Sequence, residues 1–65
     1  MDFNETNGEL LDELYYRARR SGPHAEMGNA ARMTEVYNEL RFRHLTVREH
    51  HRMLSILDEF PASFQ

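Results

Sequence analysis

The sequence contains no cysteine, no lysine and no tryptophan, and only two prolines and three glycines occur among its 65 residues. Without cysteine, neither a disulfide framework nor a thiolate zinc site can stabilise the chain. A single domain of this size buries only about 60% of the surface that its unfolded form exposes. We therefore expect one marginally stable domain that gains stability by forming a homodimer.

Long apolar runs are also missing, because no segment approaches the roughly 20 apolar residues that a membrane span needs. The chain opens with the acidic stretch MDFNETNGE, whereas a signal peptide opens with basic and then apolar residues. Together with the lack of cysteine, this predicts a cytoplasmic protein without a membrane partner. The formal net charge of −3 at pH 7 argues against nucleic-acid binding by overall charge, but leaves a local basic patch open.

Motifs of catalysis are absent as well. There is no glycine-rich phosphate loop, and Ser21, Ser55 and Ser63 have no histidine and aspartate at spacings that suggest a triad. So short a chain also has too few residues to enclose a water-free pocket. We expect a protein that is not an enzyme and that binds no cofactor.

Histidines gather at 44, 50 and 51, but no two of them have the spacing of three or four residues that directs helical side chains to one metal ion. Neighbouring residues on a helix point about 100° apart. We expect His50 to pack against the apolar stripe and His51 to face water, and we expect no metal site.

The first helix is predicted over residues 6–21. Thr6 and Glu9 have the spacing of a capping box, and the stretch SGP ends the helix because Gly22 suits a left-handed cap and Pro23 cannot continue the helix. Its expected buried face consists of Leu10, Leu11, Leu14, Tyr15 and Ala18.

The second helix is predicted over residues 23–43, with a later start at Asn29 as cap left open. Met27 and Phe42 lie on a different side from the main stripe, so we expect them to meet a second subunit or the third helix. The main apolar stripe consists of Ala30, Met33, Val36, Tyr37 and Leu40.

The third helix is predicted over residues 46–60, since Thr46 and Glu49 repeat the capping-box spacing and Pro61 ends the helix. The tail 61–65 is expected to be loose unless Phe64 folds back onto the core. The whole is an all-α, three-helix compact unit, a helical hairpin plus a third helix, that packs as a dimeric helical bundle. The expected buried residues of the third helix are Val47, Met53, Leu54, Ile56, Leu57 and Phe60.

Arginines crowd the stretch RFRHLTVREHH between the second and third helices. A cation is favoured at the end of a helix, as for Arg41 and Arg43, but disfavoured in the first turn, where Arg48 lies with Arg52 one turn on. Together with His51 these four arginines form the basic corner. Either it is neutralised by acidic residues of the first helix (Glu9, Asp12 and Glu13), or it binds an acidic partner.

Tyr16 lies on the charged face of the first helix. Its side chain either lies along the helix, contacts a second subunit or serves as an interface anchor. A helix-turn-helix reading of the basic corner fails, because bulky Leu40 and charged Arg43 take the places of a small and an apolar residue.

We therefore predict a small non-catalytic protein-binding regulator or inhibitor, of the kind that phages and plasmids encode. Its partner-binding residues are the basic corner and Tyr16, and its partner is a protein with an acidic surface. The alternative is a nucleic-acid-binding or transcription-regulating protein that places the same arginines on phosphates.

Overall fold

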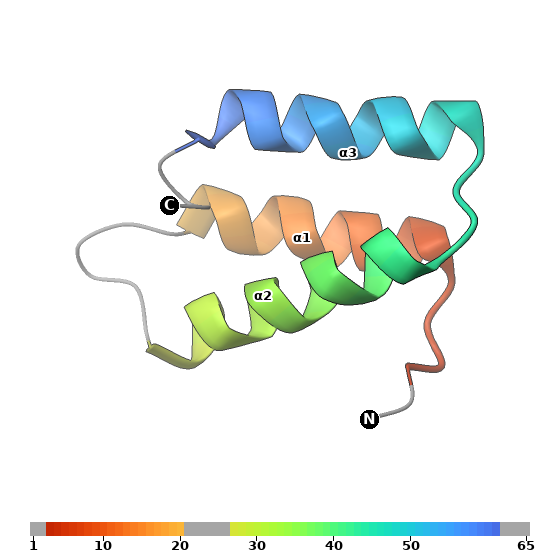
Figure 1. Cartoon of the computed structure of the whole chain (residues 1–65). Helices are drawn as coiled ribbons and strands as arrows, with labels where there is room; N and C mark the ends of the chain where they lie inside the picture. The colour runs from red at the N-terminus through yellow and green to blue at the C-terminus, as the bar shows by residue number, and fades with distance from the viewer. Residues whose placement is uncertain (1–2, 21–26, 62–65) are drawn as a thin grey trace.

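The computed structural model describes residues 3–20 and 27–61 of the chain (Figure 1). Within them the chain forms three helices and no strand: α1 (Asn7–Arg20), α2 (Met27–Phe42) and α3 (Val47–Glu59). The predicted all-α, three-helix unit is confirmed. The expected helix stop at SGP, the start at Pro23 and the position of Phe64 lie outside the described residues.

Capping boxes start both α1 and α3, as the sequence predicted. The backbone N–H of Thr6 donates to Glu9 Oε1 (2.8 Å), and the N–H of Glu9 donates to Thr6 Oγ1 (3.2 Å). Thr46 and Glu49 make the same reciprocal bonds at 2.9 and 3.1 Å. Each box satisfies two backbone donors that a helix start otherwise leaves without a partner. The alternative start at Asn29 is wrong, because this residue lies inside α2.

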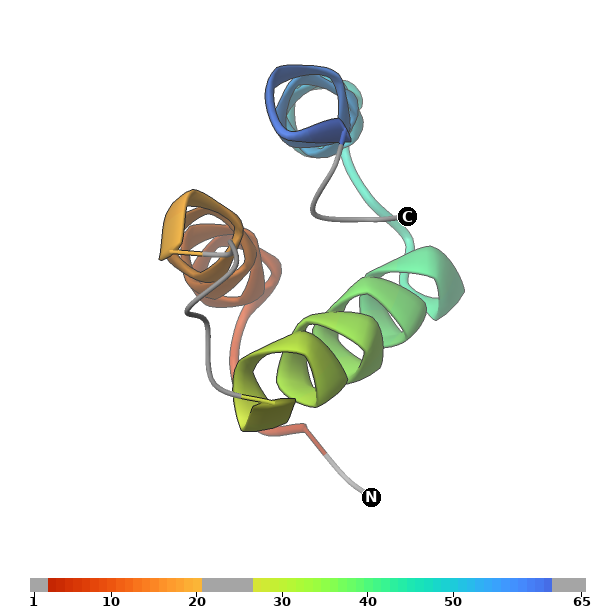
Figure 2. The same ribbon diagram turned by 90° about the vertical axis from the view of Figure 1, so that its left-hand side faces the viewer.

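Consecutive helices run in opposite directions, so that α1 and α3 are parallel and α2 is antiparallel to both (Figure 1). The central element is α1, which packs against both α2 and α3, whereas these two make few contacts with each other. Viewed along the helices, α2 is tilted, so that its beginning lies farther from α3 than its end does (Figure 2).

The core follows from this arrangement, because α1 is covered on two sides and each neighbour on one. The buried stripe of α1 and most of that of α2 are confirmed, and Tyr15, Tyr37 and Phe60 pack around them as partly buried side chains. Within the described residues the buried core side chains are Leu10, Leu11, Leu14, Ala18, Met33, Val36, Leu40, Met53 and Ile56.

Several side chains that were predicted to be buried are exposed. Val47 and Leu54 of α3 are 74% and 47% exposed, and Ala30 and His50 are exposed as well. These predictions were wrong because helical spacing alone does not show which side of a helix a neighbour covers. The third helix, α3, packs on α1 and buries Met53 and Ile56. Phe42 is 88% exposed, so α3 does not cover it.

The capping box of α3 generates a stability prediction. Replacing Thr46 with Ala removes the acceptor for the Glu49 N–H and should cost about 1 kcal/mol. In a domain of this size this lowers the melting temperature by about 4–8 °C, measured by circular dichroism. Thr34→Ala is the matched control, since its hydroxyl donates only to the carbonyl of Ala30 in its own helix. An equal loss in both variants would contradict a capping role.

Candidate functional site

The basic corner lies where α2 turns into α3, but Arg43 does not point out of it. Its Nε donates to Glu39 (2.8 Å) and its Nη1 to the carbonyl of Glu5 (2.6 Å) and to Asn7 Oδ1 (3.2 Å). Its Nη2 donates to the carbonyl of Phe3 (3.3 Å). Because these acceptors use the guanidinium donors, Arg43 holds the N-terminal segment against the end of α2 and has little capacity left for a partner.

Arg52 is also paired within the chain, through a hydrogen-bonded ion pair from Nη2 to Asp12 Oδ1 on α1. Of the three acidic residues expected to neutralise the corner, this aspartate is the one that reaches it. Glu9 bonds to Thr6, and Glu13 bonds to Arg17 and to another arginine on α2. Internal neutralisation therefore accounts for Arg43 and Arg52 only.

Arg41 and Arg48 remain as cations without a counter-charge. Within the described residues neither makes an ion pair or a hydrogen bond, and both are exposed. The guanidinium carbon of Arg41 lies 5.6 Å from the centre of the Tyr37 ring, a cation–π contact that leaves its donors available. Arg48 and the exposed His51 follow on the first turns of α3.

A groove of about 630 Å³ lies beside these cations, between α2 and α3. Its apolar lining consists of Leu40, Leu45, Val47, Met53, Leu54 and Leu57. Its basic lining consists of Arg41, Arg43, His44, His50 and His51, and no described lining residue is a carboxylate. In a chain of negative net charge, this groove is a locally basic and apolar surface.

Tyr16, the remaining predicted residue, is not part of the basic corner. It lies nine residues after Asn7 on α1, or about 13 Å along the helix axis at roughly 1.5 Å per residue. Its ring is 59% exposed and makes an edge contact with Tyr15 at 5.8 Å between ring centres. Among the described residues, Tyr16 makes no hydrogen bond or ring contact with an arginine of the basic corner, although Asp12, the partner of Arg52, lies one helical turn before it.

Asn7 is a structural residue that the sequence did not reveal. Its Nδ2 donates to the carbonyl of His44 (3.3 Å) and to Glu49 Oε1 (3.1 Å), while its Oδ1 accepts from Arg43 (3.2 Å). One side chain therefore joins the start of α1 to the end of α2 and the start of α3. These partners are 36 to 42 residues away in the chain, so no local pattern signals them.

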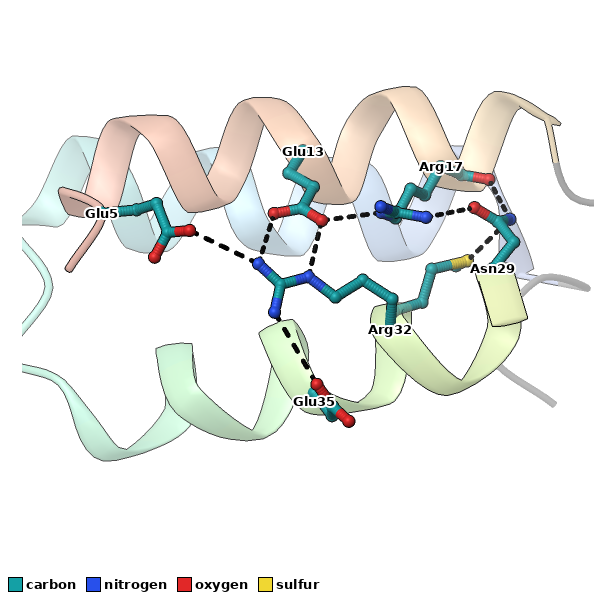
Figure 3. Close-up of polar contacts among 7 residues, drawn as sticks. Glu5, Glu13, Arg17, Asn29, Arg32 and Glu35 are labelled. Carbon is teal, nitrogen blue, oxygen red and sulfur yellow. Dashed lines mark hydrogen bonds and ion pairs between the residues drawn. The ribbon is translucent and has the colours of Figure 1, made fainter. Parts of the chain in front are cut away.

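Arg32 was missed for the same reason, and it joins α1 to α2 (Figure 3). Its Nε and Nη2 donate to the two carboxylate oxygens of Glu13 at 2.7 and 3.0 Å, a bidentate pair. Glu5 and Glu35 lie 3.5 and 3.7 Å from the same guanidinium, which also stacks over the ring of Phe3 at 4.9 Å. This arginine is fully engaged within the chain.

Arg17 and Asn29 extend this network toward the other end of α1 (Figure 3). Arg17 donates from Nε to Glu13 (2.7 Å) and from Nη1 to Asn29 Oδ1 (3.0 Å). In return, the Nδ2 of Asn29 donates to the backbone carbonyl of Arg17 (3.1 Å). Of the ion pairs in this network, Glu13–Arg17 and Arg32–Glu35 have helical spacing and were therefore readable from the sequence.

Two of the carboxyl groups that accept these hydrogen bonds, those of Glu13 and Glu49, have lowered pKa values. Hydrogen bonds from Arg32, and then from Arg17, lower the pKa of Glu13 against the opposing effect of burial. The backbone N–H of Thr46, and then the side chain of Asn7, lower the pKa of Glu49. The bond to Glu13 raises the pKa of Arg32. These shifts arise from contacts that hold the helices together.

Comparison with protein-family models, with characterised proteins and with solved structures finds no match to this chain. Among the described residues, no group of three or more histidine, aspartate or glutamate side chains is placed to hold a metal ion. No described helix has the length and apolar character needed to cross a bilayer.

Acid should destabilise the fold through Glu13 and Glu49. Their pKa values in the folded chain lie below the ordinary 4.5, so each carboxyl binds fewer protons when folded than when unfolded. The resulting stability is present above pH 4.5 and is lost as the pH falls through the folded-state values. Urea denaturation between about pH 6 and pH 3 measures this decline.

Glu13→Gln should lower stability at neutral pH, because Arg32 and Arg17 lose an ionised acceptor, and should flatten the decline in acid. Glu59→Gln is the matched control, since this exposed glutamate makes no hydrogen bond or ion pair with the described residues. An unchanged pH profile in Glu13→Gln would contradict the assignment.

Proposed function

We propose that this chain is a non-catalytic protein-binding module that regulates or inhibits a partner protein by covering an acidic site with its basic corner. The observation that carries this proposal is the pair Arg41 and Arg48, two exposed cations that have no counter-charge among the described residues. They lie next to a groove that described residues line without a carboxylate. Both features match a partner surface that combines carboxylates with apolar side chains.

The state of each arginine decides which residues anchor the partner. Arg43 and Arg52 would have to give up internal hydrogen bonds before binding, and breaking these bonds offsets the gain. Arg41 and Arg48 lose no such bond, and each guanidinium can bind a carboxylate through two parallel N–H donors. His51 stands beside them on the groove edge and adds a further donor. Tyr16 stays a candidate anchor for a separate contact through α1.

The proposal includes a homodimer in the cytoplasm. The homodimer is supported by the large apolar side chains that the protomer leaves exposed, Val47 and Leu54 on α3 and Phe42 on α2. The cytoplasmic location rests on the lack of cysteine in so small a chain. A regulator of this size fits the accessory proteins that phages and plasmids encode, and that origin stays a prediction.

Charge reversal tests the partner site. The variant Arg41→Glu/Arg48→Glu and the control Arg19→Glu/Arg20→Glu change the net charge equally, but the control arginines end α1. Affinity capture from the source cell should recover the same partner with the wild type and the control. The corner variant should bind it at least roughly tenfold more weakly, or about 1.4 kcal/mol. Equal binding by all three proteins would refute the proposal.

The exposed arginines Arg41 and Arg48 also suit the alternative function, binding to the phosphates of a nucleic acid. A salt titration distinguishes protein binding from nucleic-acid binding. A protein-binding module should show no appreciable binding to mixed-sequence DNA at low salt. Steep salt-dependent binding that the corner variant abolishes would favour the alternative, because released counterions make phosphate contacts depend strongly on salt concentration. Circular dichroism should show all variants folded, since glutamate in place of Arg48 suits a helix start.

A further inference from the structure

A stripe along α3 faces the groove instead of the core. Val47, His50 and Leu54 recur at spacings of three and four residues and line the groove, and Asp58 continues the same spacing. All four are exposed. Thus α3 has one face that packs on α1 and a second, partly apolar face that the described protomer leaves uncovered.

The charged groups on this stripe are placed on opposite sides of Leu54. His50 precedes it by four residues, and Asp58 follows it by four residues. If two copies of α3 pack antiparallel with a two-fold axis at Leu54, each residue meets the one at the mirrored distance from this position. His50 then lies opposite Asp58 of the partner subunit, and Leu54 meets its own copy. The stripe is self-complementary, which a two-fold interface requires.

We propose that α3 of a second copy fills the groove between α2 and α3, antiparallel to α3, with the two-fold axis near Leu54. The α2 and α3 helices of both subunits then form one four-helix arrangement, and each α1 covers it from outside. This inference rests on the homodimer in the proposed function and specifies its geometry.

The second copy supplies what the groove lacks. Described residues line the groove with arginine and histidine but with no carboxylate, and the incoming helix brings Asp58 of the partner subunit to His50. An imidazole N–H donates to a carboxylate whether or not the ring is protonated. Docking also removes Leu54 and Val47 from water, and burial of apolar surface drives association.

The positions of Arg41 and Arg48 relative to the groove show which part of the basic corner stays accessible in the dimer. Arg48 does not line the groove, so it stays outside when the groove is filled. Arg41 and His51 line the groove, so a second copy in the groove covers part of the basic corner. The dimer and the partner site therefore overlap at these two residues, and Arg48 is the cation of the partner site that stays accessible in the dimer.

Substitutions at the proposed axis test the geometry. Light scattering coupled to size exclusion should give a dimer for the wild type and monomers for Leu54→Asp and for Leu54→Arg, because like charges meet at the axis. An equimolar mixture of the two variants should form dimers again, since opposite charges now meet. Ser55→Asp is the control, because this exposed neighbour points about 100° away on the helix, and it should stay dimeric.

A charge exchange tests the register independently. His50→Asp and Asp58→Arg should each weaken the dimer at least roughly tenfold, and the double variant His50→Asp/Asp58→Arg should recover most of the loss. Glu59→Arg makes the same charge change as Asp58→Arg at the next residue, off the stripe, and should leave the dimer unchanged. Circular dichroism should show every variant folded, because none of these side chains is in the core.

The outcomes separate this inference from the proposed function. A dimeric wild type that tolerates both Leu54 substitutions overturns this geometry and leaves the homodimer standing. A monomeric wild type overturns both, while the partner site is judged by the Arg41 and Arg48 variant alone. A monomeric wild type that loses its captured partner on Leu54→Asp shows that another protein occupies the groove and also overturns the inference.

Discussion

The burial of α1 between its two neighbours is the constraint on which the remaining structure depends. Four of the nine buried core side chains among the described residues come from this helix, Leu10, Leu11, Leu14 and Ala18. Because α2 and α3 both pack on α1, they are held apart and leave the groove between them. The packing of both helices on α1 thus explains why the core is small and why apolar side chains stay exposed beside the groove. Both features agree with the proposal that a second copy packs against this side.

The same arrangement divides the arginines that follow α1 in the chain into two groups. Side chains that reach α1 or the segment before it find acceptors, as Arg32 does on Glu13, Arg52 on Asp12 and Arg43 on the carbonyls of Phe3 and Glu5. Arg41 and Arg48 have no such neighbour among the described residues. Of the four arginines of the basic corner, Arg43 and Arg52 therefore hold the fold together, whereas Arg41 and Arg48 are exposed on its surface.

Features that depend on neighbouring residues were predictable. The capping boxes at Thr6 and Thr46 need a glutamate three residues on, and the buried stripe of α1 needs only helical spacing. The exposed stripe of α3 was misread because Val47 and Leu54 have the same spacing as core residues. Periodicity shows that a helix has an apolar side, but it does not show whether a neighbouring helix covers that side.

By itself the sequence determined that this chain is all-α, where α1 and α3 begin and which side of α1 is buried, because these features depend on interactions within one or two helical turns. Only the tertiary structure decided that Arg43 bonds to the N-terminal segment, that Arg52 pairs with Asp12, that Asn7 joins three segments and that Leu54 lines a groove. The first three of these connect residues 36 to 42 positions apart, and they depend on how α2 and α3 pack on α1.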